Sequence, residues 1–382
     1  IYYKVFSYLH HVKIVSQYFL KFRRYGKILL NKIRRKNTMI NLKNDYCYIA
    51  HPRIMEKLNQ NLDNTYVGYG LDEHTKKASD LIKNVFKCKK ADVHFLTGGT
   101  ITNKILIAHC LKPFEAVISA DNGHIHVHET GAIEATGHKV LVVNNSDGKV
   151  KADDVEQIVV KHTDEHMVRP KMLYISNPTE YGTIYSLAEL KELYTICKKL
   201  NMYLYVDGAR LACALMANEN TIQASDLAKY VDAFYIGGTK NGLMMGEALV
   251  IVNDCLKEEF RYTQKHFGGL LAKGFLCGLQ FEALFENNLF FEIGAYQNNL
   301  ANLLTEGFKQ LGIQFFTQTR TNQVFITIEN DIVEQLSKYV MFDIWEKGSN
   351  QTTIRFVTHY KLEVSQVNEV IHLLEVLTKE RN

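Results

Sequence analysis

One stretch, Leu204 to Gly242, constrains the fold more than any other part of this chain of 382 residues. It contains two strand-like apolar runs, and a polar residue follows each of them. Asp207 ends the first run, and Lys240 follows the second run on a turn of small residues, GGT. Ligands of open α/β sheets collect at the carboxyl ends of the strands. The stretch therefore predicts an acid and a lysine at one edge of a sheet.

An acid and a lysine in this arrangement are what pyridoxal 5'-phosphate chemistry requires. The lysine amine bonds to the cofactor aldehyde, and the acid keeps the pyridine nitrogen protonated so that the ring accepts electrons. The apolar strand before Lys240 and the run GLMMG after it indicate a partly buried amine with a lowered pKa. Most lysines only solvate a surface, so a solvated side chain is the alternative that this local pattern leaves open.

The alternation of strand-like and helical patterns predicts an α/β fold with a mainly parallel, seven-stranded sheet covered on both faces. The expected strands are Val93–Leu96, Ala116–Ser119, Val140–Asn144, Met172–Ser176, Met202–Val206, Ala233–Ile236 and Ala248–Val252. We assign residues 39–253 to this large domain. Residues 254–382 form a smaller C-terminal α/β domain, with helical patterns at Leu256–His266, Leu270–Gln310 and Val364–Lys379.

The first 38 residues form a basic extension with ten Lys/Arg and no Asp/Glu. One interpretation is a basic amphipathic targeting or membrane-surface segment. We favour another, that the native enzyme begins at Met39, because the extension is poor in Ser and Ala. Removing these ten cations from the total of 45 leaves 35 against 41 acids, a net charge of −6. That balance gives no reason to expect nucleic-acid binding.

Two further compositional features concern the environment of the protein. No uninterrupted apolar run approaches the roughly 18 residues that a membrane-spanning helix needs, so we expect no membrane partner. The seven cysteines are scattered without CxxC pairs. This pattern is typical of reduced thiols in a cytoplasmic protein and predicts neither a disulfide framework nor a zinc site.

Three other segments carry side chains or backbone suited to a ligand site. Gly99 and Thr100 lie between a strand and a helix, where backbone N–H groups bind phosphate. In GHIHVHETGA we expect a short helix with one histidine, His124, against a planar cofactor and the other two histidines exposed, rather than a metal site. Arg355 lies within an apolar strand, where its partner is either a structural carboxylate or a substrate carboxylate, and Arg210 is a second candidate.

Taken together, these segments resemble the threonine aldolase and aromatic amino acid β-eliminating lyase family. The resemblance covers nearly everything from Met39 onward. It rests on DGARL from Asp207, Lys240 on its turn, Gly99 and Thr100 before a helix, HI and ETGA from His124, and RFVTH from Arg355.

The resemblance implies a fold type I enzyme that depends on pyridoxal 5'-phosphate. Such enzymes are homodimers or homotetramers with their sites at the subunit interface. The implied substrate is a small β-hydroxy amino acid, threonine or allo-threonine, cleaved by a retro-aldol reaction to glycine and an aldehyde. The alternatives are β-elimination on another amino acid and a catalytically silent protein that only binds the cofactor.

The resemblance also implies a role for each matching residue. Lys240 is the Schiff-base lysine, Asp207 the partner of the pyridine nitrogen, and His124 the ring that stacks on the cofactor. Gly99 and Thr100 bind the phosphate, while Arg210, beside the cofactor, and Arg355 hold the substrate carboxylate.

Two departures from the family pattern concern the substrate. The family usually opens with RSDT, whereas this chain has Lys43, Asn44, Asp45 and Tyr46. Asn44 therefore brings an amide where the family has a small hydroxyl near the substrate. In the second domain, where the family often has an arginine, the segment GGLLAKGF carries Lys273 as its single cation.

Overall fold

The computed structural model describes residues 39–379, so both interpretations of residues 1–38 lie outside the described residues. The central feature of the large domain is a seven-stranded sheet with the order β2-β8-β7-β6-β5-β3-β4. Its strands are β2 (Asp92–Leu96), β3 (Glu115–Ala120), β4 (Val140–Val143), β5 (Arg169–Ser176), β6 (Tyr203–Asp207), β7 (Ala233–Gly237) and β8 (Glu247–Ile251). Each of the seven expected strands is present, and every end lies within three residues of its predicted position.

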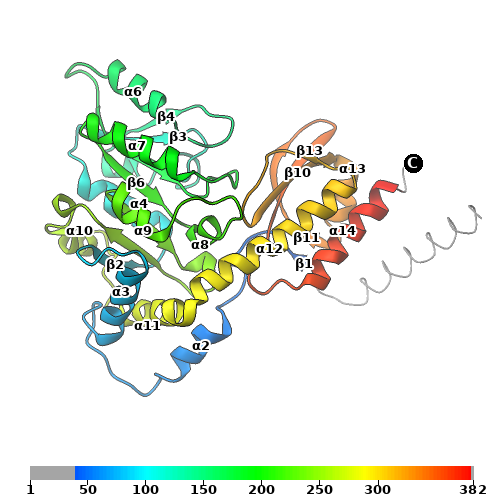
Figure 1. Cartoon of the computed structure of the whole chain (residues 1–382), viewed down its shortest axis with the longest axis horizontal. Coiled ribbons are helices and arrows are strands. Elements are labelled where there is room, and N and C mark those ends of the chain that lie inside the picture. The colour runs from blue at the N-terminus through cyan, green and yellow to red at the C-terminus, as the bar shows by residue number, and fades with distance from the viewer. Residues whose placement is uncertain (1–38, 380–382) are drawn as a thin grey trace, which may run out of the picture.

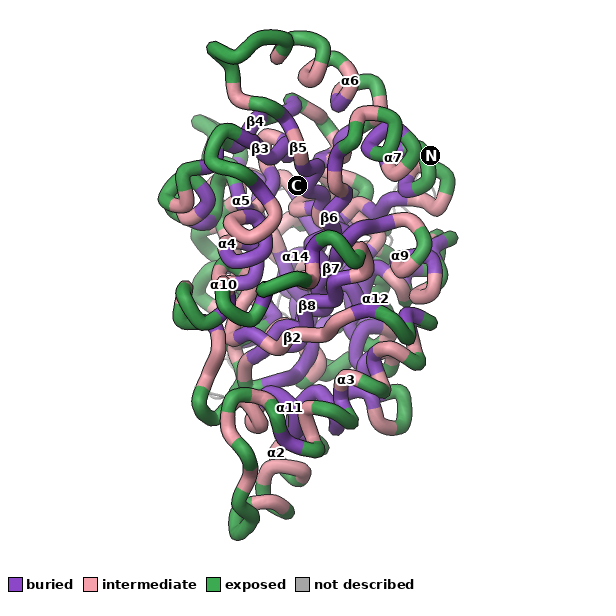
Figure 2. Tube along the Cα trace, turned by 90° about the vertical axis from the view of Figure 1, so that its left-hand side faces the viewer, coloured by how far each residue is buried: buried purple, intermediate pink, exposed green. Residues whose placement is uncertain are grey.

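The sheet is mainly parallel, as the sequence predicts. The pairs β3–β4, β3–β5, β5–β6 and β6–β7 are parallel, whereas β8 runs antiparallel to both of its neighbours, β2 and β7. Figure 2 shows the central strands β6, β7 and β8 as buried. Parallel strands covered on both faces are expected to be almost continuously apolar, which explains why these runs are recognisable in the sequence.

Alternate residues of the central strands belong to different hydrophobic cores. In β6, Leu204 and Val206 face one core, and Tyr205 faces the other. The first core is covered by α3 (Glu73–Val85), α6 (Ala152–Lys161), α7 (Leu187–Lys199), α9 (Ala224–Tyr230) and α11 (Phe275–Phe285). The second is covered by α4 (Gly99–Cys110), α5 (His124–Val127) and α10 (Phe260–His266).

The small domain is built around a four-stranded antiparallel sheet with the order β12-β13-β10-β9. A short parallel pair, β1 with β11, lies beside it. Figure 1 shows α12 running from the foot of the large domain to this small domain. The elements are β1 (Ile40–Asn41), β9 (Gln314–Phe315), β10 (Gln323–Glu329), β11 (Val340–Met341), β12 (Asp343–Lys347), β13 (Gln351–Val357), α12 (Leu289–Gln310), α13 (Asn330–Leu336) and α14 (Val364–Lys379).

Packing divides the chain differently from the predicted boundary after residue 253. Phe281 and Leu284 of α11 lie in the first core of the large domain. Ile40 and Leu42, at the start of the described chain, lie in the core of the small domain. The physical reason is that the burial of an apolar side chain depends on which surface it reaches, whatever its place in the sequence.

The long helical pattern predicted over Leu270–Gln310 is broken into α11 and α12. Asn287 and Asn288 adopt left-handed backbone conformations between them, with φ of 53° and 61°. Asparagine tolerates this region better than most residues, so the turn ends one helix and starts the next. The C-terminal helix has the predicted bounds, Val364–Lys379.

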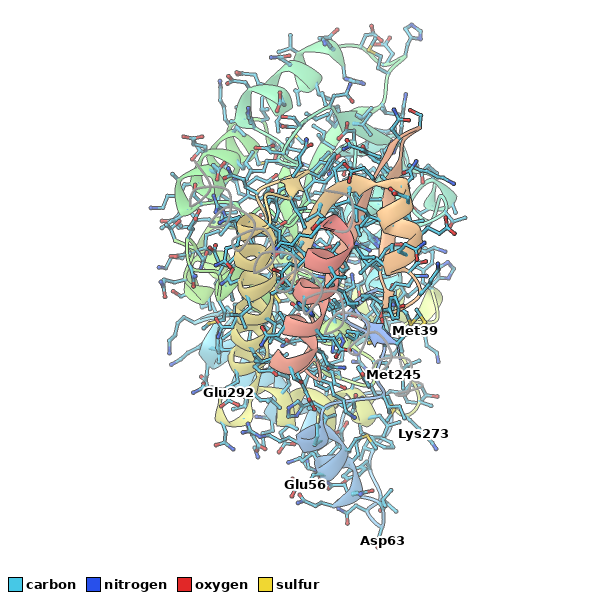
Figure 3. All side chains as sticks on the ribbon, turned by 90° about the vertical axis from the view of Figure 1, so that its right-hand side faces the viewer. Met39, Glu56, Asp63, Met245, Lys273 and Glu292 are labelled. Carbon is cyan, nitrogen blue, oxygen red and sulfur yellow. The ribbon has the colours of Figure 1, made fainter. Side chains whose placement is uncertain are left out.

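A projecting arm extends the large domain at its lower end. Helix α2 (Pro52–Asn59) buries Ile54, and Lys57 forms an ion pair of 2.6 Å with the buried Glu282 of α11. Figure 3 shows Glu56 and Asp63 at the end of this arm, away from the body. Across the described range 39–379, no helix is long and apolar enough to cross a membrane.

Candidate active site

The carboxyl ends of four neighbouring strands carry three of the predicted site residues. Strand order places β7, β6, β5 and β3 side by side. Asp207 closes β6, Lys240 follows β7 in a 3-10 turn over Thr239–Asn241, and His124 follows β3 as the first residue of α5. The structure thus brings the acid, the lysine and the histidine to one edge of the sheet.

Two glycines allow the turns after β6 and β7 to approach each other. The backbone N–H of Gly237 donates a hydrogen bond of 2.9 Å to the carbonyl of Gly208. A Cβ atom on Gly208 would lie 2.1 Å from the Tyr235 carbonyl oxygen, and one on Gly237 would lie 2.0 Å from that of Ala209. Any side chain at either position would force these turns, which carry Asp207 and Lys240, apart.

Three donors fix the Asp207 carboxylate, which is buried. The Tyr174 hydroxyl donates to its Oδ2 at 2.5 Å, and Asn103 Nδ2 donates to the same oxygen at 3.3 Å. The backbone N–H of Ala209 donates to Oδ1 at 3.0 Å. Burial and the charge of Asp207 raise the pKa of Tyr174 well above its usual value. The phenol therefore keeps its proton and remains a donor.

A chain of hydrogen bonds joins Asp207 to His124. Asn103 Nδ2 also donates to Glu129 Oε1 at 2.7 Å, and the Tyr205 hydroxyl donates to Asn103 Oδ1 at 2.8 Å. His124 Nδ1 lies 2.9 Å from the same Glu129 oxygen. The amide of Asn103 thus fixes both carboxylates relative to each other, and Glu129 fixes the imidazole ring.

The His124 imidazole has a raised pKa. Burial alone would lower it, but the hydrogen bond to Glu129 and the charges of Glu180 and Asp207 outweigh burial and the opposing Lys240 charge. The contact with Glu129 favours the charged form of the ring, in which Nδ1 donates to the carboxylate. A ring held in this way is a flat surface for a planar cofactor.

Lys240 is partly exposed and has a lowered pKa. Burial is the main cause, and the nearby Arg210 guanidinium adds to it, outweighing the carboxylates of Asp45, Glu180 and Asp207. A lowered pKa increases the share of neutral amine, which is the form that attacks an aldehyde. Sequence reasoning predicts both the partial burial and the direction of this shift.

Arg210 is engaged in a buried ion pair that the sequence does not predict. Its Nε lies 2.7 Å from Asp45 Oδ2, and its Nη2 lies 3.1 Å from Oδ1. Asn322 Nδ2 donates to Asp45 Oδ2 at 2.9 Å. Burial would raise the pKa of Asp45, but the charges of Arg210 and Lys240 and these hydrogen bonds lower it overall. The second amino group of Arg210, Nη1, takes no part in this ion pair.

Arg355, on β13, lies near Arg210 with one donor still available. Its Nη2 pairs with Asp343 Oδ2 at 2.7 Å, and its Nη1 donates to Gln323 Oε1 at 3.1 Å. Its guanidinium lies 5.1 Å from the centre of the Trp345 ring. Within the described chain its Nε is buried without a hydrogen-bond partner. Burial, followed by the Arg210 charge, lowers the pKa of Arg355. An anion bound between the two guanidinium groups would accept a hydrogen bond from Arg355 Nε and offset the repulsion between the two positive charges.

Gly99 and Thr100 form the first turn of α4, as predicted. The helix begins after Gly98, whose position offers no side-chain cap, and it extends over twelve residues. Gly99 is required by close packing, because a Cβ atom there would lie 2.9 Å from the Tyr235 hydroxyl. The first-turn N–H groups of such a helix are donors suited to a phosphate.

Asn44 lies beside the buried Asp45 and is partly exposed. Its side-chain oxygen accepts a hydrogen bond of 3.2 Å from the backbone N–H of Tyr46. Its position next to the partner of Arg210 brings the amide to the same part of the site as the two arginines. The predicted contact with a substrate remains a prediction.

The histidine-rich segment folds as expected. His124 to Val127 form the short helix α5, and His126 and His128 are exposed. Between residues 39 and 379, no group of three or more His, Cys, Asp or Glu side chains is arranged to hold a metal ion.

Four residues of the site carry no signal that sequence reasoning used. Asn103, Tyr174 and Asp45 act through contacts with residues 104, 33 and 165 positions away. Glu180 lies four residues beyond the end of β5. The position of Glu180 after a strand of the parallel sheet is a signal that could have identified it, because the same reasoning selects Asp207 and Lys240.

Comparison with known proteins agrees with this geometry. The family model described as beta-eliminating lyase matches residues 52–331. A low-specificity L-threonine aldolase of Pseudomonas aeruginosa is 29% identical over 313 residues, which is 79% of this chain and 87% of that protein. The corresponding enzyme of a Pseudomonas species is 30% identical over 290 residues, 74% of this chain and 81% of that protein.

Solved structures lead to the same assignment. The structure of a Leishmania major threonine aldolase matches with a TM-score of 0.88 and 42% identity, covering 88% of this chain and 99% of that one. A Thermus thermophilus aspartate aminotransferase matches with a TM-score of 0.68 and 13% identity over 92% of this chain and 95% of that one, which shows the fold alone. The architecture is that of fold type I enzymes, and the chain belongs to the beta-eliminating lyase family, which includes the threonine aldolases.

Proposed function

We propose that this protein is a pyridoxal 5'-phosphate-dependent carbon–carbon lyase that cleaves threonine or allo-threonine to glycine and acetaldehyde. The observation that carries the proposal is the shared sheet edge of Asp207 and Lys240. There a buried, triply hydrogen-bonded carboxylate lies near a lysine with a lowered pKa. The similarity to threonine aldolases supports the choice of reaction.

The residues at this edge fit the cofactor. Asp207 would accept a hydrogen bond from the protonated pyridine nitrogen and so keep it protonated, and Lys240 would bond to the aldehyde carbon. The first turn of α4, at Gly99 and Thr100, would bind the phosphate. His124 would lie against the ring. Beside His124, the buried Glu129 Oε2 has no partner in the part of the chain that the structure describes, so this polar network has an acceptor left for a ligand.

The protein's own groups would prepare the substrate for cleavage. When bound, the cofactor supplies a ring that accepts the electrons released at Cα. Arg355 Nε and Arg210 Nη1 would hold the carboxylate, with Asn44 beside it. Fixing the carboxylate fixes the direction of the Cα–Cβ bond, and the cleaved bond must lie perpendicular to the ring for its electrons to enter the ring.

The proposal is tested by incubating the purified chain with pyridoxal 5'-phosphate and either L-threonine or L-allo-threonine. We expect glycine and acetaldehyde in equal amounts, together with a visible absorbance band from cofactor bound to the protein. A protein that binds the cofactor but releases no aldehyde from either isomer would contradict the proposed reaction.

The name of the matching family model favours β-elimination as a second candidate. In that reaction Cα loses its proton, a β-substituent leaves, and the products are ammonia and a keto acid. Product analysis of the same incubations, extended to serine and cysteine, separates the two reactions. A catalytically silent protein that only binds the cofactor would give neither set of products.

We further propose a homodimer or homotetramer with the sites at the subunit interface. Exposed apolar side chains support this proposal, because large exposed apolar surfaces mark interaction sites. Next to Asp45, Tyr46 and Ile49 are 55% and 72% exposed. Beyond α2, Leu62 and Leu71 are 74% and 66% exposed. The first of these segments directly follows Asp45, the partner of Arg210.

A cytoplasmic location also belongs to the proposal. Its support is the cysteines, because each of the seven is a free thiol in the structure: Cys47, Cys88, Cys110, Cys197, Cys213, Cys255 and Cys277. Free thiols are typical of reducing compartments.

A further inference from the structure

A carboxylate that sequence reasoning did not select, Glu180, lies at the same sheet edge as the site. It is carried by the turn that follows β5, the strand between β3 and β6. In the β5–β6 register, Ser176 pairs with Asp207, so the turn starts beside the pyridine-binding acid. A small cavity is lined by Glu180 together with Tyr174, Ser176 and Gly123. Glu180 therefore lies just beyond the carboxyl end of β5, next to the strand that ends in Asp207.

The small domain holds this turn in place. The carbonyl of Gly182 accepts hydrogen bonds from the Arg320 backbone N–H at 3.1 Å and the Thr321 hydroxyl at 3.3 Å. Tyr181 packs against Phe316 and Trp345, with ring centres 5.6 Å and 6.0 Å apart. These contacts fix the two residues that follow Glu180, so its carboxylate has a defined position.

Five groups of the predicted site experience the charge of Glu180. They are the side chains of His124, His128, Lys240, Arg210 and Arg355, and in each case the Glu180 carboxylate raises the pKa. These five side chains come from four segments of the chain, and their interaction with Glu180 agrees with its position at the carboxyl end of β5.

Glu180 differs from the other carboxylates at this edge of the sheet, because within residues 39–379 it forms no hydrogen bond and no ion pair. The other carboxylates are occupied. Asp45 binds Arg210 and Asn322, Asp207 binds three donors, and Glu129 binds Asn103 and His124.

The imidazole nearest to Asp207, His124, is already engaged. Its Nδ1 lies 2.9 Å from Glu129 Oε1, and this contact raises the pKa of the ring against the effect of burial. His128 lies on the exposed side of α5, 5.5 Å from His124 between ring centres. Retro-aldol cleavage needs an acceptor for the proton of the β-hydroxyl group.

We propose that the Glu180 carboxylate removes the β-hydroxyl proton of the substrate. This inference rests on the proposed function. The O–H bond breaks and its proton moves to a Glu180 oxygen, while the O–H electron pair forms the second carbon–oxygen bond of the aldehyde. The Cα–Cβ bond breaks and its electron pair stays with the Cα side. A proton from solvent then adds to Cα, which completes glycine, and Glu180 releases the proton it took to solvent, which restores its carboxylate.

The test compares Glu180→Gln with the wild-type chain, both loaded with pyridoxal 5'-phosphate. Glutamine keeps the size of the side chain and removes its ability to accept a proton. We expect kcat for L-threonine to fall about 100-fold or more, the range typical of a lost general base, with KM nearly unchanged. Glu165→Gln, in the exposed loop before β5, is the matched control and should retain wild-type kcat.

A second readout separates this role from a structural one. Exchange of the glycine α-proton with deuterium, followed by NMR, uses the same cofactor and carboxylate contacts but involves no hydroxyl group. We expect Glu180→Gln to exchange glycine at the wild-type rate. Wild-type kcat in this variant, or loss of glycine exchange together with kcat, would overturn the proposal.

Failure of the proposed function would be seen in the wild-type protein and not only in the variant. A wild-type protein that exchanges glycine but releases no aldehyde would refute the retro-aldol reaction itself. If Glu180→Gln does not fold, Glu180→Ala is assayed with and without formate. A rise in kcat of about tenfold or more with formate supports Glu180 as the acceptor, and no rise overturns it.

Discussion

The Arg210 guanidinium and the Asp45 carboxylate form a bidentate ion pair inside the protein, with Nε 2.7 Å from Oδ2 and Nη2 3.1 Å from Oδ1. The pair joins the turn after β6 to the segment that follows β1. It leaves Nη1 of Arg210 as the group available to a ligand. Asp45 thus determines how the arginine of the site is presented.

Asp45→Asn should destabilise the fold and weaken the site. The substitution leaves the buried Arg210 charge without its partner, which typically costs about 3–5 kcal/mol. Urea denaturation of the two proteins measures the difference in free energy of unfolding. Asp164→Asn, at an exposed position, is the control and should change it by less than about 0.5 kcal/mol. An Asp45 variant as stable as wild type would mean that the pair contributes nothing.

Tyr174→Phe should weaken cofactor binding without unfolding the protein. It removes the hydroxyl that donates to Asp207 at 2.5 Å and leaves the ring in place. A lost hydrogen bond to a charged group corresponds to about 1.5–3 kcal/mol, or roughly a tenfold or larger rise in the Kd of pyridoxal 5'-phosphate. Cofactor titration followed by absorbance measures it.

The control for this substitution is Tyr262→Phe, since Tyr262 is 78% exposed on α10. We expect its Kd to equal that of wild type. If Tyr174→Phe and wild type had the same Kd for pyridoxal 5'-phosphate, the hydrogen bond from Tyr174 to Asp207 would contribute nothing to cofactor binding.

The His124–Glu129 pair should make stability depend on pH. The folded-state pKa of His124 is raised, so its contribution is fully present below the ordinary value of about 6.5 and is lost as pH rises through the raised value. Glu129→Gln removes the partner of the charged ring. The difference in free energy of unfolding between wild type and this variant should therefore narrow as pH rises from about 6 to about 9.

Denaturation curves at several pH values measure this trend. A difference that stays constant, or widens toward high pH, would show that the charged form of His124 is not what Glu129 stabilises.

Leu71→Asp and Ile49→Asp should reduce the assembly to monomers. Both side chains are largely exposed, and a charge in the centre of an apolar interface is unfavourable without a partner. Light scattering measures the mass of the assembly. We expect both this mass and the rate of aldehyde release to fall in the two variants. Val160→Asp, on α6 at the opposite end of the large domain in Figure 1, is the control and should leave the mass unchanged.

Much of the fold could be predicted because its strands are local patterns. The seven apolar runs and the final helix each lie within one stretch of sequence, and Lys240 and Asp207 follow directly from where those runs end. Because ligands collect at the carboxyl ends of parallel strands, these two residues are then predicted to lie in a ligand site.

The unpredicted parts depend on contacts between distant residues. Nothing near Tyr174 or Asn103 in sequence indicates that Asp207 will be their acceptor. Similarly, the placement of Ile40 in the small-domain core becomes evident only after β1 pairs with β11. The break at Asn287 is local, but asparagine also occurs within helices, so its left-handed conformation is not dictated by its identity.

The central claim is that Lys240 carries the cofactor chemistry. Its most direct test is aldehyde release from L-threonine and L-allo-threonine by Lys240→Ala and wild-type protein, with absorbance recorded in the same samples. We predict that wild type shows the visible band and releases acetaldehyde, and that the variant shows neither. A variant that keeps the band and the activity would contradict the assignment of Lys240.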